Sequence, residues 1–340
     1  MIKLEDIREI NIELSSHCNA RCPLCVRNFH GFPHNFGYEE TDLTLAQLKD
    51  IVPESLVAQL DHVMVNGDFG DMLMNPETPE ILAWFREYGR KHTVINRVGF
   101  PPWKQPGLII DVFTNGGARG RDFWQALGSL DLDINFCIDG LEDTHHLYRQ
   151  NTLYETVIRN AGYYIAAGGR AHWCMTEFDH NRHQIDQARE RSNALGFHRF
   201  FTRYTGRDTG PVYDQNGHKV FVLKQESSTG YTYPEIMSTE WADQHTRDMP
   251  SVPRRELRCE ALNTWPVSIY IAADGTLDPC CMIGNYTKPG KNWGQHDLTA
   301  LRGEQSITTL EKNIAWFNRV IDTFGTDGQL NVCSTYCGKD

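Results

Sequence analysis

The sequence predicts an α/β fold with a parallel sheet, because short apolar runs alternate with helix-like segments through its first two thirds. Each run has the length of a strand and ends in polar or glycine-rich residues, a pattern typical of parallel βα units. Six strands are expected, at Asn11–Leu14, His62–Asn66, Leu108–Thr114, Ile134–Asp139, His172–Phe178 and Phe200–Tyr204. Helices are expected between them, for example at Leu45–Leu60, Pro79–Arg90, Thr152–Ala167 and Asn181–Leu195.

Composition restricts the classes of function. The 340 residues contain no apolar run long enough for a membrane span and no secretory signal, so we expect a soluble, cytoplasmic protein. The formal net charge of -11 disfavours nucleic-acid binding through a broad basic surface, although a local basic pocket for an anionic substrate remains open. Ten cysteines without an export signal favour metal or cluster ligation over disulfides.

Three of these cysteines form a C-x3-C-x2-C pattern directly after the first expected strand. Cys18, Cys22 and Cys25 can ligate three irons of a cubane [4Fe–4S] cluster, which leaves the fourth iron open. An open metal position can bind a small chelating molecule, whereas a closed site only holds structure. A zinc knuckle that borrows a ligand such as His17 is the alternative interpretation.

This cysteine loop, followed by a parallel βα array, resembles the radical S-adenosylmethionine (SAM) superfamily. The resemblance implies a partial (β/α)6 TIM-like barrel over residues 1–206. It also implies that the amino and carboxylate groups of SAM chelate the open iron. An electron, from a donor such as flavodoxin or ferredoxin, then cleaves SAM, and the resulting 5′-deoxyadenosyl radical abstracts a hydrogen atom from the substrate.

Later segments match the superfamily in order. Phe69, Gly70 and Asp71 resemble its Gly-Gly-Glu-Pro segment, which holds the SAM amino group, with Phe69 in place of a glycine and Asp71 in place of the glutamate. A backbone carbonyl can still accept from an ammonium group, and aspartate keeps the carboxylate.

Three further segments extend the match. Asn115 lies in a third-strand Thr-Asn-Gly segment, Cys137 and Asp139 lie in a segment that resembles Ser-x-Asp-Gly, and Arg149 lies where the superfamily often places an arginine near the SAM carboxylate. Turn or capping chemistry is the other explanation for Asn115 and Asp139. The resemblance implies that all of these residues bind SAM.

A second group of cysteines lies near the carboxyl terminus. Cys259 is followed by fifteen residues, Gly275, four residues and Cys280, and Cys333 and Cys337 form a C-x3-C pair. A hairpin with its turn before Gly275 would return Cys280 towards Cys259. The layout resembles the SPASM/twitch domain, which implies an auxiliary [4Fe–4S] cluster in residues 259–340, in the shorter twitch form.

Three points about these cysteines stay open. Cys281 beside Cys280 complicates the choice of ligand. A zinc site with four cysteine ligands is the alternative for this half of the chain. Cys174, inside an apolar strand, reads as an ordinary buried thiol.

Residues 207–258 differ from the βα array. An Asn216-Gly217 turn signal lies between short apolar stretches, and a polar segment rich in serine and threonine follows. We expect a linker or cap with a small hairpin here, and a helix at Asp297–Phe324 in the last part of the chain.

Candidates for substrate contact or acid–base chemistry lie at the ends of the last two expected strands of the array. Glu177, His180 and Tyr204 carry groups that can exchange protons, and Arg203 can pair with a carboxylate of the substrate or of SAM. His180 could instead cap the following helix, and Arg203 could form a salt bridge on the rim.

The predicted function is radical SAM chemistry, of oxidoreductase or lyase type. An auxiliary cluster favours oxidation or bond formation, with the cluster as electron acceptor or part of the substrate site. Only about ten residues precede the first expected strand, which leaves no room for a leader-peptide domain and favours a small polar metabolite as substrate. The alternatives are a peptide-modifying maturase (oxidation, cross-linking or epimerisation) and a non-catalytic, zinc-stabilised interaction protein.

Overall fold

The protein is built on one large, mainly parallel sheet. The computed structural model describes residues 1–34, 39–91, 107–205, 209–225, 233–246, 267–286 and 310–327, with 256–257, 259, 261–262, 329–330, 333–334 and 337. The eight-stranded sheet has the order β12, β11, β1, β4, β5, β6, β7, β8. Its strands are β1 (Ile7–Ile12), β4 (His62–Val65), β5 (Ile109–Thr114), β6 (Asp133–Cys137), β7 (Arg170–Thr176), β8 (Arg199–Arg203), β11 (Val267–Ile271) and β12 (Leu277–Asp278).

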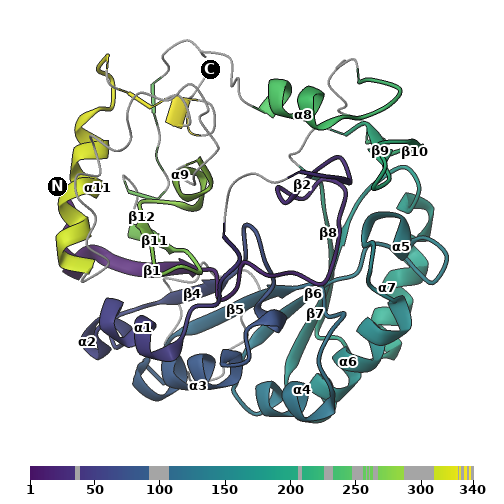
Figure 1. Ribbon diagram of the computed structural model, residues 1–340. Coiled ribbons are helices and arrows are strands. Elements are labelled where there is room, and N and C mark those ends of the chain that lie inside the picture. Colours follow the sequence, from purple (N-terminus) through teal and green to yellow (C-terminus); the bar gives the residue numbers. More distant parts are fainter. Residues whose placement is uncertain are drawn as a thin grey trace.

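The pairing confirms the predicted α/β fold. The six expected strands are present in the expected order along the chain, and every pair from β1 through β4 to β8 is parallel. Figure 1 shows the sheet curved, with helices along its outer side. These are α1 (Leu45–Ile51), α2 (Glu54–Val57), α3 (Thr78–Tyr88), α4 (Arg121–Gly128), α5 (His145–Tyr148), α6 (Tyr154–Ala166) and α7 (Ile185–Ala194). Such a curved βα array is consistent with a partial barrel.

The helices bury one face each, as amphipathic segments on a sheet must. In α3 the side chains of Ile81, Leu82 and Phe85 are fully buried, and they belong to the same apolar core as the strand residues Ile110 and Val112. The core therefore lies between the sheet and its outer helices, and the loops at the strand ends are left to form a site.

The long helix expected at Leu45–Leu60 is two short helices instead. The first begins at Thr44, whose hydroxyl accepts from the backbone N–H of Gln47, and ends at Val52. Val52 is extended because the ring of Pro53 excludes the helical conformation from the residue before it. The second helix, α2, starts directly after this proline.

The C-terminal part of the chain continues the barrel sheet. Strand β11 pairs in parallel with β1, with Ile10 opposite Ile269, and β12 folds back antiparallel to β11. Helices α9 (Cys281–Tyr286) and α11 (Leu310–Asp322) complete this part and lie together on one side in Figure 1. The expected division at residue 206 and residues 297–309 of the expected C-terminal helix lie outside the described residues.

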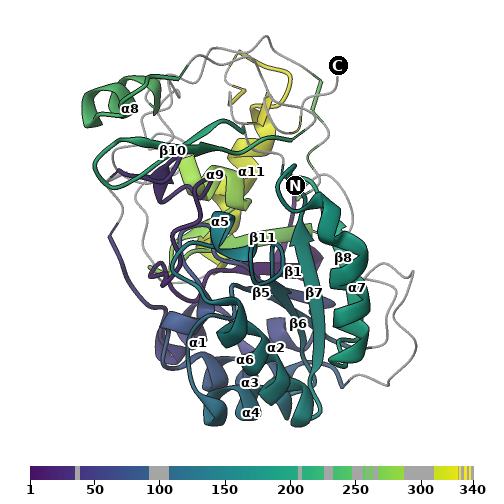
Figure 2. The ribbon, with the colours of Figure 1, turned by 90° about the vertical axis from the view of Figure 1, so that its right-hand side faces the viewer.

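A cap covers the end of the molecule where the parallel strands finish. Strands β9 (Pro211–Tyr213) and β10 (Lys219–Val222) form an antiparallel hairpin, which is followed by α8 (Thr239–Thr246). This hairpin contacts a second one, β2 (Asn28–Phe29) with β3 (Phe32–Pro33), through the hydrogen bond from the Tyr213 backbone N–H to the His30 carbonyl at 2.9 Å. In Figure 2 these elements lie above the sheet.

At the opposite end, where the strands begin, the buried His62 lies between two partly buried carboxylates. His62 Nε2 lies 3.1 Å from Asp111 Oδ2, and His62 Nδ1 lies 3.7 Å from Glu9 Oε1. No helix of the described residues is both long and apolar enough to cross a membrane.

Candidate active site

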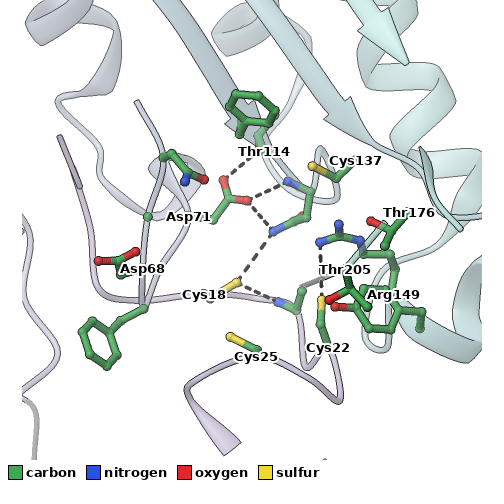
Figure 3. Close-up of a pocket in the computed structure, with 18 of the residues that line it drawn as sticks. Cys18, Cys22, Cys25, Asp68, Asp71, Thr114, Cys137, Arg149, Thr176 and Thr205 are labelled. Atoms are coloured by element: carbon green, nitrogen blue, oxygen red, sulfur yellow. Dashed lines mark hydrogen bonds between the residues drawn. The ribbon is translucent and has the colours of Figure 1, made fainter. Parts of the chain in front are cut away.

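A cavity of about 290 Å³ lies at the carboxyl ends of the parallel strands. Its walls come from the loops after β1, β4, β5, β6, β7 and β8, which are far apart in sequence. Parallel strands bring such loops together because all of their carboxyl ends meet at one edge of the sheet. The side chains at its centre, shown in Figure 3, include Cys18, Cys22, Cys25, Asp71, Cys137 and Arg149.

The three cysteines of the first group share this cavity. Their loop turns sharply, with the Cys25 backbone N–H donating to the Cys22 carbonyl at 2.9 Å. The backbone N–H of Ala20 donates to Cys18 Sγ at 3.4 Å. Burial raises the pKa of both Cys18 and Cys22, in Cys22 to about 11, and a bound metal would favour the thiolate forms of these sulfurs.

Two donors from other strands reach the cysteine sulfurs. Asn115 Nδ2, after β5, lies 3.7 Å from Cys18 Sγ, and Arg149 Nη1, after β6, lies 3.5 Å from Cys22 Sγ. Both contacts are drawn in Figure 3. Hydrogen bonds to ligand sulfurs are one of the means by which proteins tune an iron–sulfur cluster, so the donor set fits a cluster held by these three residues.

The carboxylate of Asp71 holds the loop after β5 in place. It accepts from Thr114 Oγ1 at 2.8 Å, from the Asn115 backbone N–H at 2.7 Å, from Asn115 Nδ2 at 2.8 Å and from the Leu73 backbone N–H at 3.1 Å. Burial raises the pKa of this carboxyl above its usual range. Asp71 therefore orients the amide that reaches Cys18.

Asp139 does the same for Arg149. Its carboxylate is fully buried, accepts from Arg149 Nε at 2.6 Å and also accepts from the Thr176 backbone N–H. With Nε fixed in this way, Nη1 of Arg149 lies beside Cys22. Two buried carboxylates thus each orient one donor towards one cysteine sulfur.

The second cysteine group lies in a different kind of pocket. Cys259, Cys280, Cys333 and Cys337 line a space of about 20 Å³ together with apolar side chains that include Leu262, Val320 and Phe324. The residues come from three distant segments of the chain, which α9 and α11 bring together. Burial raises the pKa of Cys333 to about 12. Among the described His, Cys, Asp and Glu side chains, no group of three is arranged to hold a single metal ion.

Cys280 and Cys281 face different neighbours. Burial raises the pKa of both thiols, but the ionisable groups that act on Cys280 are other cysteines, among them Cys259 and Cys333. Burial and the carboxylate of Asp68 raise the pKa of Cys281, and Asp68 lines the larger cavity. The structure therefore groups Cys280, and not Cys281, with the other three C-terminal cysteines.

Comparison with solved structures identifies the fold. SuiB of Streptococcus suis bound to its precursor peptide SuiA aligns with 96% of this chain and 70% of its own, with a TM-score of 0.55 and 12% sequence identity. SuiB bound to S-adenosylmethionine aligns with 89% of this chain and 67% of its own, with a TM-score of 0.53 and 12% identity. The chain has the fold of a radical SAM enzyme. No family model and no curated protein sequence matches it.

Within this radical SAM fold, most of the residues predicted to bind SAM line one cavity. Phe69, Gly70, Asp71, Asn115, Cys137 and Arg149 are all in its wall, whereas Asp139 lies behind Arg149 and is fully buried. Gly70 is required sterically, because a Cβ atom there would lie 1.9 Å from the Ser15 carbonyl oxygen. Asp71 already accepts four hydrogen bonds, from Thr114, Asn115 and Leu73, so an ammonium group would have to share its oxygens.

The four candidates for substrate contact divide into two pairs. Arg203 and Tyr204 line the cavity, while Glu177 and His180 do not. The Glu177 side chain is buried, and the His180 ring stacks on Phe178 with ring centres 5.4 Å apart. The structure thus brings only the β8 pair to the place where a substrate would bind.

Sequence reasoning missed Glu13, which follows β1 directly. This buried carboxylate accepts from the backbone N–H groups of Phe69 at 2.6 Å and Gly70 at 2.9 Å, and its second oxygen accepts from Tyr270 Oη at 3.3 Å. A charged residue between the apolar residues Ile12 and Leu14 was the available signal, since a buried carboxylate needs donors. Glu13 fixes the loop after β4 and ties it to β11.

Proposed function

We propose that this chain is a radical SAM enzyme that reductively cleaves SAM and functionalises a C–H bond of its substrate. The observation that carries the proposal is the convergence of three free cysteines with the donors Asn115 and Arg149 on one cavity at the strand ends. When bound, a [4Fe–4S] cluster and SAM would supply the 5′-deoxyadenosyl radical that abstracts the hydrogen atom.

The chain's own residues have separable roles in this proposal. Cys18, Cys22 and Cys25 hold the cluster, and the N–H groups of Asn115 and Arg149 stabilise the negative charge on two of the sulfurs. Backbone carbonyls in the loop after β4 accept from the SAM ammonium group. Arg149, held beside Cys22 by Asp139, provides positive charge for the SAM carboxylate.

Apolar side chains shield the buried part of the cysteine loop from water. Tyr148, Phe178, Val212 and Leu223 are buried in one cluster with Ala20, Cys22 and Leu24 of that loop. Two of these residues, Val212 and Leu223, belong to the cap, so the cap hairpin covers the loop from outside. Exclusion of water protects a reactive intermediate from side reactions.

The four C-terminal cysteines are proposed to hold an auxiliary [4Fe–4S] cluster in a twitch-type domain. Four thiols from three segments in an apolar pocket provide a complete ligand set, which suits electron transfer better than ligand exchange. Such a cluster would supply an electron acceptor, which favours oxidation or bond formation as the reaction. An external donor such as flavodoxin or ferredoxin would supply electrons to the first cluster.

A small polar metabolite is the proposed substrate. The cavity wall also carries the polar side chains of Thr176, Arg203, Tyr204 and Thr205, and such groups orient a hydroxylated or charged molecule. A peptide is the second candidate, because the likeness to SuiB includes the structure with the peptide SuiA bound. The two candidates share the same radical chemistry and differ in the ligand that fills the cavity.

Anaerobic purification and reconstitution test the proposal. We expect about eight iron and about eight sulfide per chain, and formation of 5′-deoxyadenosine on addition of SAM and dithionite. A variant in which Cys18, Cys22 and Cys25 are all alanine should keep about half of the iron and form no 5′-deoxyadenosine. Colourless protein with stoichiometric zinc, or undiminished 5′-deoxyadenosine formation by the triple variant, would refute the proposal.

Metabolite and peptide fractions separate the two substrate candidates. Each is added to the reconstituted protein with SAM and dithionite, and 5′-deoxyadenosine is measured against a sample without substrate. A rise with the small-molecule fraction alone supports the first candidate, and a rise with the peptide fraction alone replaces it with the second.

A further inference from the structure

Two arginines line the cavity, and their partners differ. Arg149 is paired with the buried carboxylate of Asp139, with a distance of 2.6 Å from Nε to Oδ2. For Arg203, at the end of β8, no Asp or Glu among the described residues lies within ion-pair distance. The cavity wall therefore contains one cation with an internal carboxylate and one without.

Arg203 is held in a defined orientation by neutral and sulfur-containing groups. Its Nε donates to Thr176 Oγ1 at 3.3 Å, and its Nη2 lies 3.8 Å from Cys137 Sγ. The guanidinium carbon is 5.8 Å from the centre of the Phe113 ring. Three neighbouring strands, β5, β6 and β7, thus supply the contacts that fix this side chain on β8.

Part of the guanidinium remains available to a ligand. The Nη1 group of Arg203 donates to none of the described residues, and Nη2 meets only the weak acceptor sulfur of Cys137. A guanidinium presents parallel N–H groups that match the two oxygens of a carboxylate.

We propose that Arg203 binds a carboxylate group of the substrate. This inference rests on the proposed function, because it takes the cavity as the place where SAM and substrate meet. SAM itself carries a carboxylate, but Arg149 lies 3.5 Å from Cys22 Sγ in the cysteine loop, whereas Arg203 contacts Thr176 and Cys137 at the ends of β7 and β6. We therefore assign one carboxylate to each cation, that of SAM to Arg149 and that of the substrate to Arg203.

Calorimetric binding of simple carboxylates tests the assignment. The probes are acetate, succinate and N-acetylglycine, with the neutral N-acetylglycinamide as the matched compound, each titrated into the reconstituted protein in saturating SAM. We expect binding on the order of 1 mM for at least one acid and none for the amide. In Arg203→Gln this binding should weaken at least about tenfold, with partial recovery in Arg203→Lys, since lysine keeps the charge without the fork.

Arg199 provides the matched control. It lies on the same strand, four residues earlier, and its guanidinium stacks over Phe201 outside the cavity lining. Arg199→Gln should leave both SAM and carboxylate binding unchanged. Equal loss of carboxylate binding in Arg199→Gln, or no Arg203-dependent binding of any acid, would overturn the assignment.

SAM affinity distinguishes the two sources of the carboxylate. If Arg203→Gln weakens SAM binding about tenfold or more, Arg203 serves the SAM carboxylate and the inference is wrong. Failure of the proposed function would give a different result. Carboxylate binding would still depend on Arg203, but neither the parent protein nor any variant would form 5′-deoxyadenosine.

Discussion

The two cysteine sites differ in number, surroundings and origin. Cys18, Cys22 and Cys25 come from one short loop and open onto a cavity of about 290 Å³ with charged and polar walls. Cys259, Cys280, Cys333 and Cys337 come from distant segments and enclose about 20 Å³ among apolar side chains. Three ligands beside open space suit a reacting metal, and four ligands in a closed apolar pocket suit a permanent one.

The donors around the two sites differ in the same direction. In the first site, Asn115 and Arg149 reach two sulfurs, and buried Asp71 and Asp139 orient those donors. In the second, the ionisable groups that act on Cys280 and Cys333 are other cysteines. The first site therefore has hydrogen-bond donors that can tune a bound cluster, whereas the second surrounds its ligands with apolar side chains.

The largest expected effect is the loss of SAM cleavage when the open site, formed by Cys18, Cys22 and Cys25, loses a ligand. Cys22→Ala removes one of only three ligands, so we expect 5′-deoxyadenosine formation to fall by about a thousandfold or more. About four iron per chain should remain in the closed site, formed by Cys259, Cys280, Cys333 and Cys337. Iron analysis and chromatography of the products measure both quantities, and Cys174→Ala, outside both groups, is the control. Retention of all eight iron in Cys22→Ala would break the comparison.

The closed site should respond differently to the same change. In Cys333→Ala we expect loss of about four iron per chain, with SAM cleavage in the absence of substrate retained to within about tenfold. Substrate turnover should be lost, because the electron acceptor is missing. Loss of SAM cleavage in a folded Cys333→Ala protein that keeps its first cluster would show that the two sites are not separable.

Substitution of the adjacent Cys280 and Cys281 tests which of the two is a ligand in the closed site. Cys280→Ser should lose the second cluster, while Cys281→Ser should keep it, because only Cys280 lines the pocket with the other three cysteines. Iron content and the visible spectrum of the two variants, prepared in parallel, provide the measurement. The reverse pattern would mean that Cys281, the first residue of α9, binds the metal in place of Cys280.

A smaller effect is expected where the two regions meet. Glu13→Leu leaves the buried N–H groups of Phe69 and Gly70 without their acceptor, which should lower the free energy of unfolding by about 2–5 kcal/mol. Tyr270→Phe removes only the single 3.3 Å bond to the same carboxylate and should cost about 1 kcal/mol or less. Denaturant unfolding of the two variants measures both values. Equal losses would mean that Glu13 does not carry the loop after β4.

The smallest expected effect lies outside both cysteine sites. It is the pH dependence of the free energy of unfolding that His62 causes. Burial alone would lower the pKa of His62, but its interactions with Asp111 and Glu9 outweigh burial and raise the pKa to about 9. Because the folded pKa lies above the unfolded value of about 6.5, the stabilisation is complete below pH 6.5 and is lost as pH rises through 9.

The size of this contribution is about 1–3 kcal/mol. Denaturant unfolding of the parent protein between pH 6 and 10 should show the loss, and His62→Gln should show a smaller pH dependence over the same range. An identical dependence in the two proteins would assign the effect to another group.

Local sequence patterns predicted much of the fold, but they could not predict the long-range contacts. The six parallel strands and their order follow from the alternation of apolar runs with helices, and Pro53 should have predicted the break between α1 and α2. The parallel pairing of β11 with β1 joins residues more than 250 positions apart, and no local pattern encodes such a pairing.

The candidate site shows the same division. The spacing of Cys18, Cys22 and Cys25 is visible in the sequence, and the structure places them together in one cavity. The exclusion of Glu177 and His180 from the cavity depends on the packing of the segment after β7, in which His180 stacks on Phe178. The different surroundings of Cys280 and Cys281 likewise depend on the position of α9 relative to two separate pockets.

The most direct test of the central claim is the electron paramagnetic resonance spectrum of the dithionite-reduced protein with and without SAM. The account predicts that SAM changes the spectrum of the parent protein and of Cys333→Ala, and leaves that of Cys22→Ala unchanged. The change would then belong to the cluster of the open site alone. The claim would be contradicted if the parent protein held both clusters and its spectrum did not change with SAM. It would also be contradicted if the spectrum of Cys22→Ala still changed with SAM.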